Sequence, residues 1–139
     1  MELCISRRQH DQLLKWANDA DERECCGLLL GQDARVQKMV LADNVAPQTF
    51  THFEIDPGTL IAAEKNARGG GLAVLGYFHS HPNGVGQPSD TDAEMAAADG
   101  RFWVIIALDT MTGWHATENG TVHGKFNRIA LVIDDDAQG

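Results

Sequence analysis

The sequence predicts an α/β (α+β) fold, a single domain in which a mixed β-sheet is flanked by helices. Its 139 residues suit one compact domain. Short apolar runs of strand length alternate with segments that carry helix-start signals. No repeat, low-complexity tract or linker divides the chain. We therefore expect one domain over residues 1–139, with a frayed acidic tail at residues 134–139.

The N-terminal third predicts a helix followed by a hairpin. Ser6 and Gln9 make a capping box, and Leu13 begins an apolar stripe at helical spacing, so we place the first helix at residues 6–20. The next segment, ECCGLLLGQDARVQKMVLADNVA, holds two apolar runs separated by GQD. This pattern predicts a hairpin whose return strand covers residues 36–41.

The rest of the chain predicts further strands around two more helices. A brief strand, THFEI, precedes Asp56 and Pro57, which suit the N-cap and first position of a helix over residues 57–68 that three glycines end. LAVLGYFH has the apolar continuity of a strand buried on both faces, and Pro82 prevents it from continuing. DAEMAAAD suits a short helix, FWVIIAL a buried strand, and GWHAT, TVHGKF and RIALVI the remaining strands.

Composition excludes several classes of function. The net charge is −9 and the eleven Lys and Arg residues are scattered, which disfavours nucleic-acid partners. No segment has the ~20 apolar residues needed to cross a membrane, and the N-terminus lacks a secretory signal pattern. The cysteines, Cys4, Cys25 and Cys26, are odd in number and include an adjacent pair, so a disulfide framework is not expected. We expect a soluble, cytoplasmic protein.

The stretch GYFHSHPNGVGQPSDTD, residues 76–92, carries the strongest chemical signal. Residues two apart in a strand point the same way, so His79 and His81 share a face. Two imidazoles can bind one Zn²⁺ at about 2.0–2.1 Å, and a catalytic zinc site needs a third protein ligand. Asp92, in the first turn of the following helix, is the candidate. Ser89 faces the same direction and could donate a hydrogen bond to a developing oxyanion.

Simpler structural roles compete with this interpretation. Ser89 and Asp92 also fit a capping box at the start of a helix, and for these two residues alone capping is the better explanation. The conjunction of H-x-H, a seven-residue spacer and S-x-x-D in one loop favours a site. Other conspicuous side chains are expected to be surface or core residues: His10, His52, His115, His123, Trp103 and Trp114.

The motif resembles the zinc-binding signature of the JAMM (MPN+) metalloproteases, isopeptidases that cut ubiquitin-like proteins from their conjugates. The resemblance implies a JAB/MPN fold of the cytidine-deaminase-like type, one zinc ion per chain bound by His79, His81 and Asp92, and stabilisation of the tetrahedral intermediate by Ser89. Glu24-Cys25-Cys26-Gly27-Leu28-Leu29-Leu30-Gly31 resembles the family context of a catalytic glutamate. Strand parity alone leaves Glu22 and Glu24 both open, so the choice of Glu24 comes from the resemblance.

The resemblance continues through NVA, FEIDP and FWVIIAL and is strongest to the short, stand-alone prokaryotic branch. The usual proline shortly before the glutamate is replaced by ADER. The implied substrate is an amide or isopeptide bond after the C-terminal Gly-Gly of a small ubiquitin-like or sulfur-carrier protein. The tail is expected to pair with the segment at residues 44–55. Release of cysteine from a sulfur carrier, a non-catalytic MPN scaffold and a homodimer remain compatible with the sequence.

Overall fold

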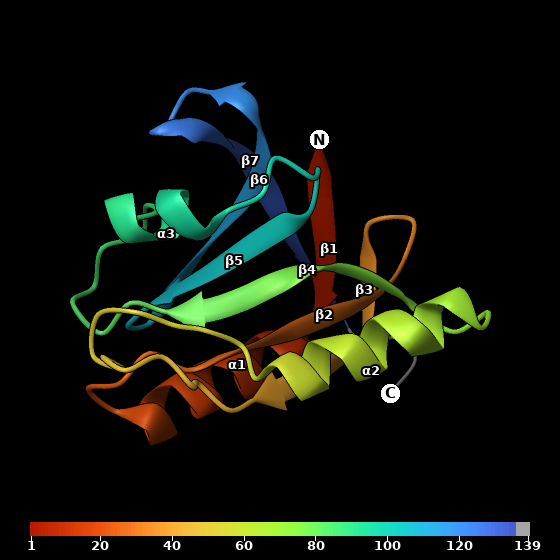
Figure 1. The fold of residues 1–139 in the computed structure, drawn as a ribbon, viewed down its shortest axis with the longest axis horizontal. Coiled ribbons are helices and arrows are strands. Elements are labelled where there is room, and N and C mark those ends of the chain that lie inside the picture. Colours follow the sequence, from red (N-terminus) through yellow and green to blue (C-terminus); the bar gives the residue numbers. More distant parts are fainter. Residues whose placement is uncertain (136–139) are drawn as a thin grey trace.

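The computed structural model describes residues 1–135, and the strands of these residues close into one ring (Figure 1). Around the ring their order is β1-β3-β2-β4-β5-β6-β7. The elements in chain order are β1 (Glu2–Ser6), α1 (Arg7–Ala20), β2 (Cys26–Gln32), β3 (Arg35–Ala42), α2 (Pro57–Arg68), β4 (Ala73–Ser80), α3 (Asp90–Met95), β5 (Phe102–Ala107), β6 (Thr110–Gly120) and β7 (Gly124–Asp134). The predicted mixed sheet with helices is present, but the sheet curls until its two ends pair.

Strand β1 closes the ring, although no local pattern in residues 2–6 predicts a strand there. It pairs in parallel with β7 along its whole length and with β3 at one position. Leu3 and Ile5 are fully buried in the largest core cluster. Ser6 ends the strand and also caps α1, because its hydroxyl accepts a hydrogen bond from the Gln9 amide. The predicted capping box is therefore confirmed, with a strand directly before it.

The two longer helices contact different parts of the ring. Helix α1 packs against β1, β5 and β7, and the ring of Trp16 stacks on that of Phe78 at 5.7 Å. Helix α2 packs against β4 and begins as predicted, with Asp56 as its N-cap and Pro57 in its first turn. The local signals for both helices thus agree with the structure.

Strand β4 lies between β2 and β5, antiparallel to the first and parallel to the second. His79 pairs with Cys26 of β2 and Ile105 of β5, so it occupies the middle of the sheet. Burial on both faces holds only for Phe78 to Ser80, since the earlier residues alternate between buried and partly exposed. The histidine motif therefore starts at the most buried end of a central strand.

Several local predictions are wrong in detail. The expected strand THFEI contributes only one bridge, between Ile55 and Asn44. Helix α3 ends at Met95, one turn earlier than DAEMAAAD suggested. The last three expected strands are two long ones, and TVHGKF spans the turn between β6 and β7. These errors occur where long-range pairing, rather than local pattern, sets the limits of an element.

The C-terminal segment also differs from expectation. Asp134 does not begin a frayed tail: it ends β7, and its carboxylate contacts the Arg35 guanidinium at 2.8 Å. The remainder of the predicted tail, residues 136–139, lies outside the described residues.

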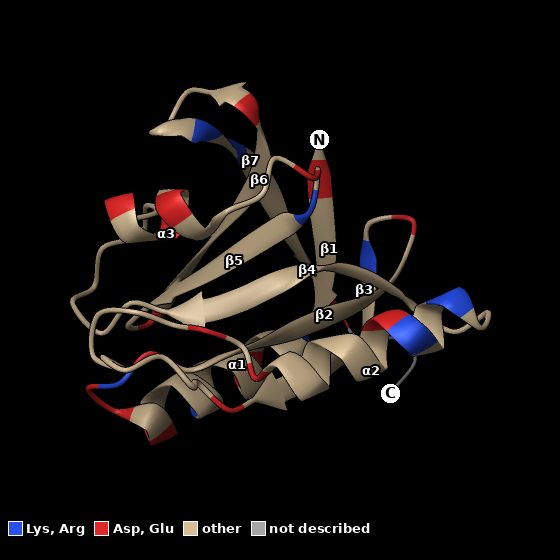
Figure 2. Ribbon diagram, viewed as in Figure 1, with Lys and Arg blue, Asp and Glu red and all other residues tan. Residues whose placement is uncertain are grey.

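The structure shows where the basic residues lie, whether a helix could cross a membrane, and how the cysteines are placed. Figure 2 shows Lys and Arg dispersed over several elements, including α2 and the β6–β7 hairpin. Within residues 1–135, no helix has both the length and the apolar character required to cross a membrane. All three cysteines are free, and Cys25 and Cys26 are buried.

Candidate metal centre

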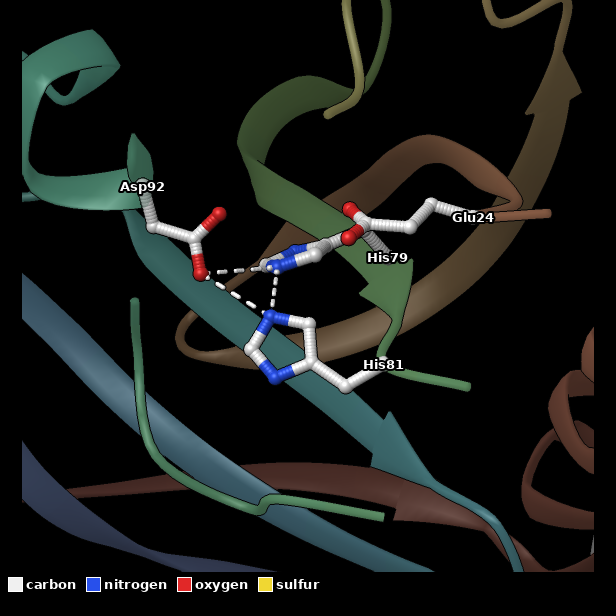
Figure 3. A group of neighbouring side chains, drawn as sticks. All are labelled: Glu24, His79, His81 and Asp92. Atoms are coloured by element: carbon white, nitrogen blue, oxygen red, sulfur yellow. Dashed lines mark hydrogen bonds and ion pairs between the residues drawn. The ribbon is translucent and has the colours of Figure 1, made fainter. Parts of the chain in front are cut away.

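The end of β4 brings two imidazoles together. His79 lies within the strand and His81 follows its last residue, and their Nε2 atoms are 3.0 Å apart (Figure 3). Both side chains are buried, at 0% and 4% relative exposure. The prediction that they share a face is therefore confirmed.

Helix α3 supplies the third group. Asp92 Oδ2 lies 3.1 Å from His79 Nε2 and 3.0 Å from His81 Nε2. The same oxygen accepts a hydrogen bond from the Ser89 amide, while the Ser89 hydroxyl accepts one from the Asp92 amide. Asp92 thus belongs both to the capping box with Ser89 and to the cluster with the two histidines. The two explanations that the sequence left in competition are compatible.

Glu24, rather than Glu22, completes the group. Neither residue lies in a strand, because β2 begins at Cys26, so the parity argument does not apply. Glu22 is exposed, whereas Glu24 is 6% exposed and projects toward the histidines (Figure 3). Its amide donates to the Thr49 carbonyl at 2.7 Å. One carboxylate oxygen, Oε1, is buried and has no hydrogen-bond partner among the described residues.

The pKa values of the two carboxyl groups, Glu24 and Asp92, shift in opposite directions. Burial raises the pKa of Glu24 to about 7 despite the opposing effect of His81. Burial also acts to raise the pKa of Asp92, but the two histidines and the Ser89 amide outweigh it and hold this pKa well below its usual range. At neutral pH Asp92 is therefore ionised, while Glu24 can both accept and release a proton.

The two histidines differ in their hydrogen bonding. His81 Nδ1 donates to the Val85 carbonyl at 2.7 Å, which leaves the Nε2 lone pair facing the cluster. His79 Nδ1 is buried and makes no hydrogen bond to the described residues. Burial lowers the pKa of His79, whereas the hydrogen bonds to Asp92 and Val85 raise that of His81 against its burial.

The donor set fits a divalent metal ion. Ligand atoms of Glu24, His79, His81 and Asp92 all lie within 4.8 Å of one another, and all four side chains are buried. A triangle of two imidazole nitrogens and one carboxylate oxygen with edges of 3.0–3.1 Å can be capped by one ion at zinc's usual ligand distance of about 2.0–2.1 Å. Three ligands of this kind are typical of a catalytic rather than a structural zinc site.

A cavity of about 350 Å³ is lined by two of the four side chains, Glu24 and His81. Phe50, Thr51 and several residues of the loop and helix start between Pro82 and Thr91 complete its lining. Ser89 borders this cavity, and because its oxygen accepts from the Asp92 amide, its own hydrogen remains available to a ligand. The site is therefore both buried and accessible.

The other conspicuous residues lie outside the group. His10 contacts Asp11, His52 contacts Thr51, and His123 contacts Pro88 and Asp90. His115 packs near the ring of Phe102. Trp103 and Trp114 are buried, as predicted. Sequence reasoning missed Asn44 and Phe53, which contact Glu24 and His79; the only signal was their position in NVA and FEIDP.

Comparison with known proteins places this centre in a family. A model of the prokaryotic homologs of the JAB domain matches residues 6–119. The chain belongs to this family. A desampylase from Haloferax volcanii is 34% identical over 139 residues, which cover 95% of this chain and 96% of that protein.

Two further proteins are similar to this chain, one in the sequence of about half of it and the other in its fold. A probable TtuB-protein conjugate cleaving protease from Thermus thermophilus is 35% identical over 74 residues, 53% of this chain and 49% of that protein. A solved structure described as a JAMM metalloprotease-like zinc site in the proteasome and signalosome has a TM-score of 0.56 and 18% identity, and the match covers 95% of this chain and 99% of that one. It shares the fold of this prokaryotic JAB protein.

Proposed function

We propose that this JAB protein is a zinc-dependent isopeptidase that hydrolyses the amide bond after the C-terminal Gly-Gly of a ubiquitin-like or sulfur-carrier protein. One observation carries the proposal: four buried polar side chains from three segments converge within 4.8 Å. Burying such groups is costly unless they are paired or bind a metal. The names of the Haloferax and Thermus relatives support protease action on protein conjugates.

His79, His81 and Asp92 would hold the zinc ion. A bound zinc ion polarises a carbonyl oxygen and lowers the pKa of water to about 7. Val85 contributes by fixing the ring of His81 through its carbonyl, and the Ser89 amide orients the Asp92 carboxylate. These contacts hold the donors in place before substrate binds.

Glu24 would transfer the proton, and Ser89 would stabilise the negative charge that develops on the substrate. Glu24 takes a proton from the attacking water and delivers it to the departing amine. In the metal-free chain, burial raises the pKa of this carboxyl group to about 7. Ser89 donates a hydrogen bond from its hydroxyl group to the oxyanion that forms on the scissile carbonyl. Both side chains line the same cavity, as this division of roles requires.

The Gly-Gly tail would approach along the segment at residues 44–55. This segment lines two adjoining cavities of about 270 and 230 Å³, together with Met95 at the end of α3. Glycines lack side chains, so a tail of this kind can lie extended against a narrow groove.

The first experiment is a zinc measurement. We expect about one zinc per chain in the wild type and none in a His79→Ala/His81→Ala variant, by elemental analysis of untagged protein. Protein that binds no zinc even after zinc is added would contradict the proposal and favour a non-catalytic scaffold.

The second experiment tests turnover. Glu24→Gln should retain zinc but lose hydrolysis of a Gly-Gly-tailed protein joined to a lysine peptide, because the variant cannot accept a proton. Glu22→Gln is the matched control, since Glu22 is exposed, and it should remain active. A second substrate, a Gly-Gly-tailed protein that carries a C-terminal cysteine, would separate isopeptide cleavage from release of cysteine when the products of both substrates are identified by mass spectrometry. Normal turnover by Glu24→Gln would refute its role.

A further inference from the structure

Two aromatic rings enclose the imidazole of His79. The Phe53 ring stacks on it with centroids 4.2 Å apart and an interplanar angle of 18°. The Trp103 ring meets it edge-on at 5.6 Å and 90°. Phe53 and Trp103 are each 4% exposed, and His79 is fully buried. The orientation of His79 is therefore restricted by packing on its face and at its edge.

Hydrogen bonding does not provide the same restriction. Histidines that bind metals almost always donate the second ring N–H to a carbonyl or carboxylate, which fixes the ring and its tautomer. His81 follows this pattern through the Val85 carbonyl. His79 does not, because its Nδ1 is buried without a partner among the described residues. Apart from the contacts of its Nε2 with Asp92 and His81, the ring of His79 is held by packing, and Phe53 makes the closest ring contact to it.

Asn44 fixes the backbone on both sides of Phe53. Its side-chain nitrogen donates to the carbonyls of Glu24 and His52, each at 2.9 Å. Its side-chain oxygen accepts from the amides of Ala46 and Glu54, at 3.1 and 3.0 Å. These bonds use both donor hydrogens and both acceptor positions of the amide. A single side chain thus connects the residues flanking Phe53 to the backbone of Glu24.

We propose that Phe53, held in place by Asn44, is the positioning residue of His79: its ring supplies by stacking the orientation that a hydrogen bond supplies to His81. The inference depends on the proposed function only in that the centre binds zinc. Because Phe53 also lines both cavities along residues 52–55, it links the metal centre to the proposed tail groove.

Zinc affinity tests the proposal with matched variants. Phe53→Leu should lower the affinity for zinc at least about tenfold, as loss of a residue that orients a metal ligand does. Phe53→Tyr keeps the ring and should retain wild-type affinity. Phe126→Leu is the control for core damage, since Phe126 is fully buried in the same cluster but contacts Trp103 rather than His79. Affinities would be measured by competition with a chromophoric chelator.

Asn44 gives a second, independent variant. Asn44→Asp removes the two donated hydrogen bonds while preserving the shape of the side chain, so we expect the same direction of change in zinc affinity. Asn127→Asp is its control, because the side-chain oxygen of Asn127 accepts from the Thr121 amide, remote from the centre in sequence. Equal losses in Asn44→Asp and Asn127→Asp would overturn the role of Asn44.

Two spectra separate positioning from general destabilisation. Co²⁺ substituted at the site should show an altered visible spectrum in Phe53→Leu and a wild-type spectrum in Phe126→Leu. In metal-free protein, the His79 ring protons should give one set of signals shifted by the Phe53 ring current, and broadened or multiple signals in Phe53→Leu. Wild-type zinc affinity and cobalt spectrum in Phe53→Leu, or equal affinity losses in Phe126→Leu, would overturn the proposal. Failure of wild type to bind zinc would instead overturn the proposed function.

Discussion

Glu24 is a carboxyl group placed where ionisation is unfavourable, and this has a measurable effect on stability. Its pKa rises from 4.5 to about 7 in the folded chain, mainly through burial. The folded state therefore binds the proton more tightly than the unfolded state. The sign follows: without metal, the free energy of unfolding carries no penalty below pH 4.5 and decreases as pH rises to about 7.

Replacing Glu24 with a neutral isostere should remove that loss. In chelator-treated protein, Glu24→Gln should be more stable than wild type above about pH 7, by up to about 3 kcal/mol, and the difference should shrink toward pH 4.5. Urea unfolding at several pH values measures this, with Glu22→Gln as the exposed control. A stability difference that does not change with pH would show that burial does not perturb Glu24.

At the scale of elements, the two capping boxes provide an internal comparison. Ser6 and Ser89 each accept a hydrogen bond from the amide three residues on, and the amide of each serine donates one to the side-chain oxygen of that same residue, Gln9 or Asp92. Only the box at α3 borders the metal centre. Replacing either serine with alanine should therefore cost a similar amount of stability but have different consequences for activity.

We expect Ser6→Ala and Ser89→Ala each to lower the free energy of unfolding by about 1 kcal/mol. Ser89→Ala should also lower kcat by about 10²–10³-fold, as loss of one oxyanion donor does, while Ser6→Ala should leave kcat unchanged. Thermal unfolding and turnover of the Gly-Gly-tailed conjugate are the measurements. If Ser89→Ala turned over normally, its role would be limited to capping.

The elements with local signals were predictable, and those without were not. Capping boxes, an N-cap followed by proline and the H-x-H motif are set by residues within a few positions, so α1, α2 and the approach of His79, His81 and Asp92 follow from sequence. Helix α3 ends early because Ala96 adopts an extended conformation, although its neighbours are good helix formers. Local preference was overridden there by packing, since Ala96 is buried in a core cluster.

At the scale of the whole molecule, closure of the ring depends on contacts between the two ends of the chain. Glu2 pairs with Ala130 and Ser6 with Asp134, a separation that no local periodicity encodes. The same limitation concealed the neighbours of the metal centre: Phe53 contacts His79, and Asn44 contacts Glu24, across long separations in sequence. The metal-ligand motif was visible because it is local, whereas the residues that hold it were not.

This dependence on closure makes β1 a test of the fold. Ile5 is fully buried in the cluster that also contains Phe78 of β4 and Val104 of β5. Ile5→Ala should therefore lower the free energy of unfolding by about 2–5 kcal/mol, measured by urea denaturation. Leu41→Ala, in β3, is the control, because Leu41 is 48% exposed and its truncation leaves little cavity. Equal losses from the two substitutions would mean that β1 does not close the ring in solution. Since β1 contributes no side chain to the four-residue centre, the folded Ile5→Ala protein should still bind zinc.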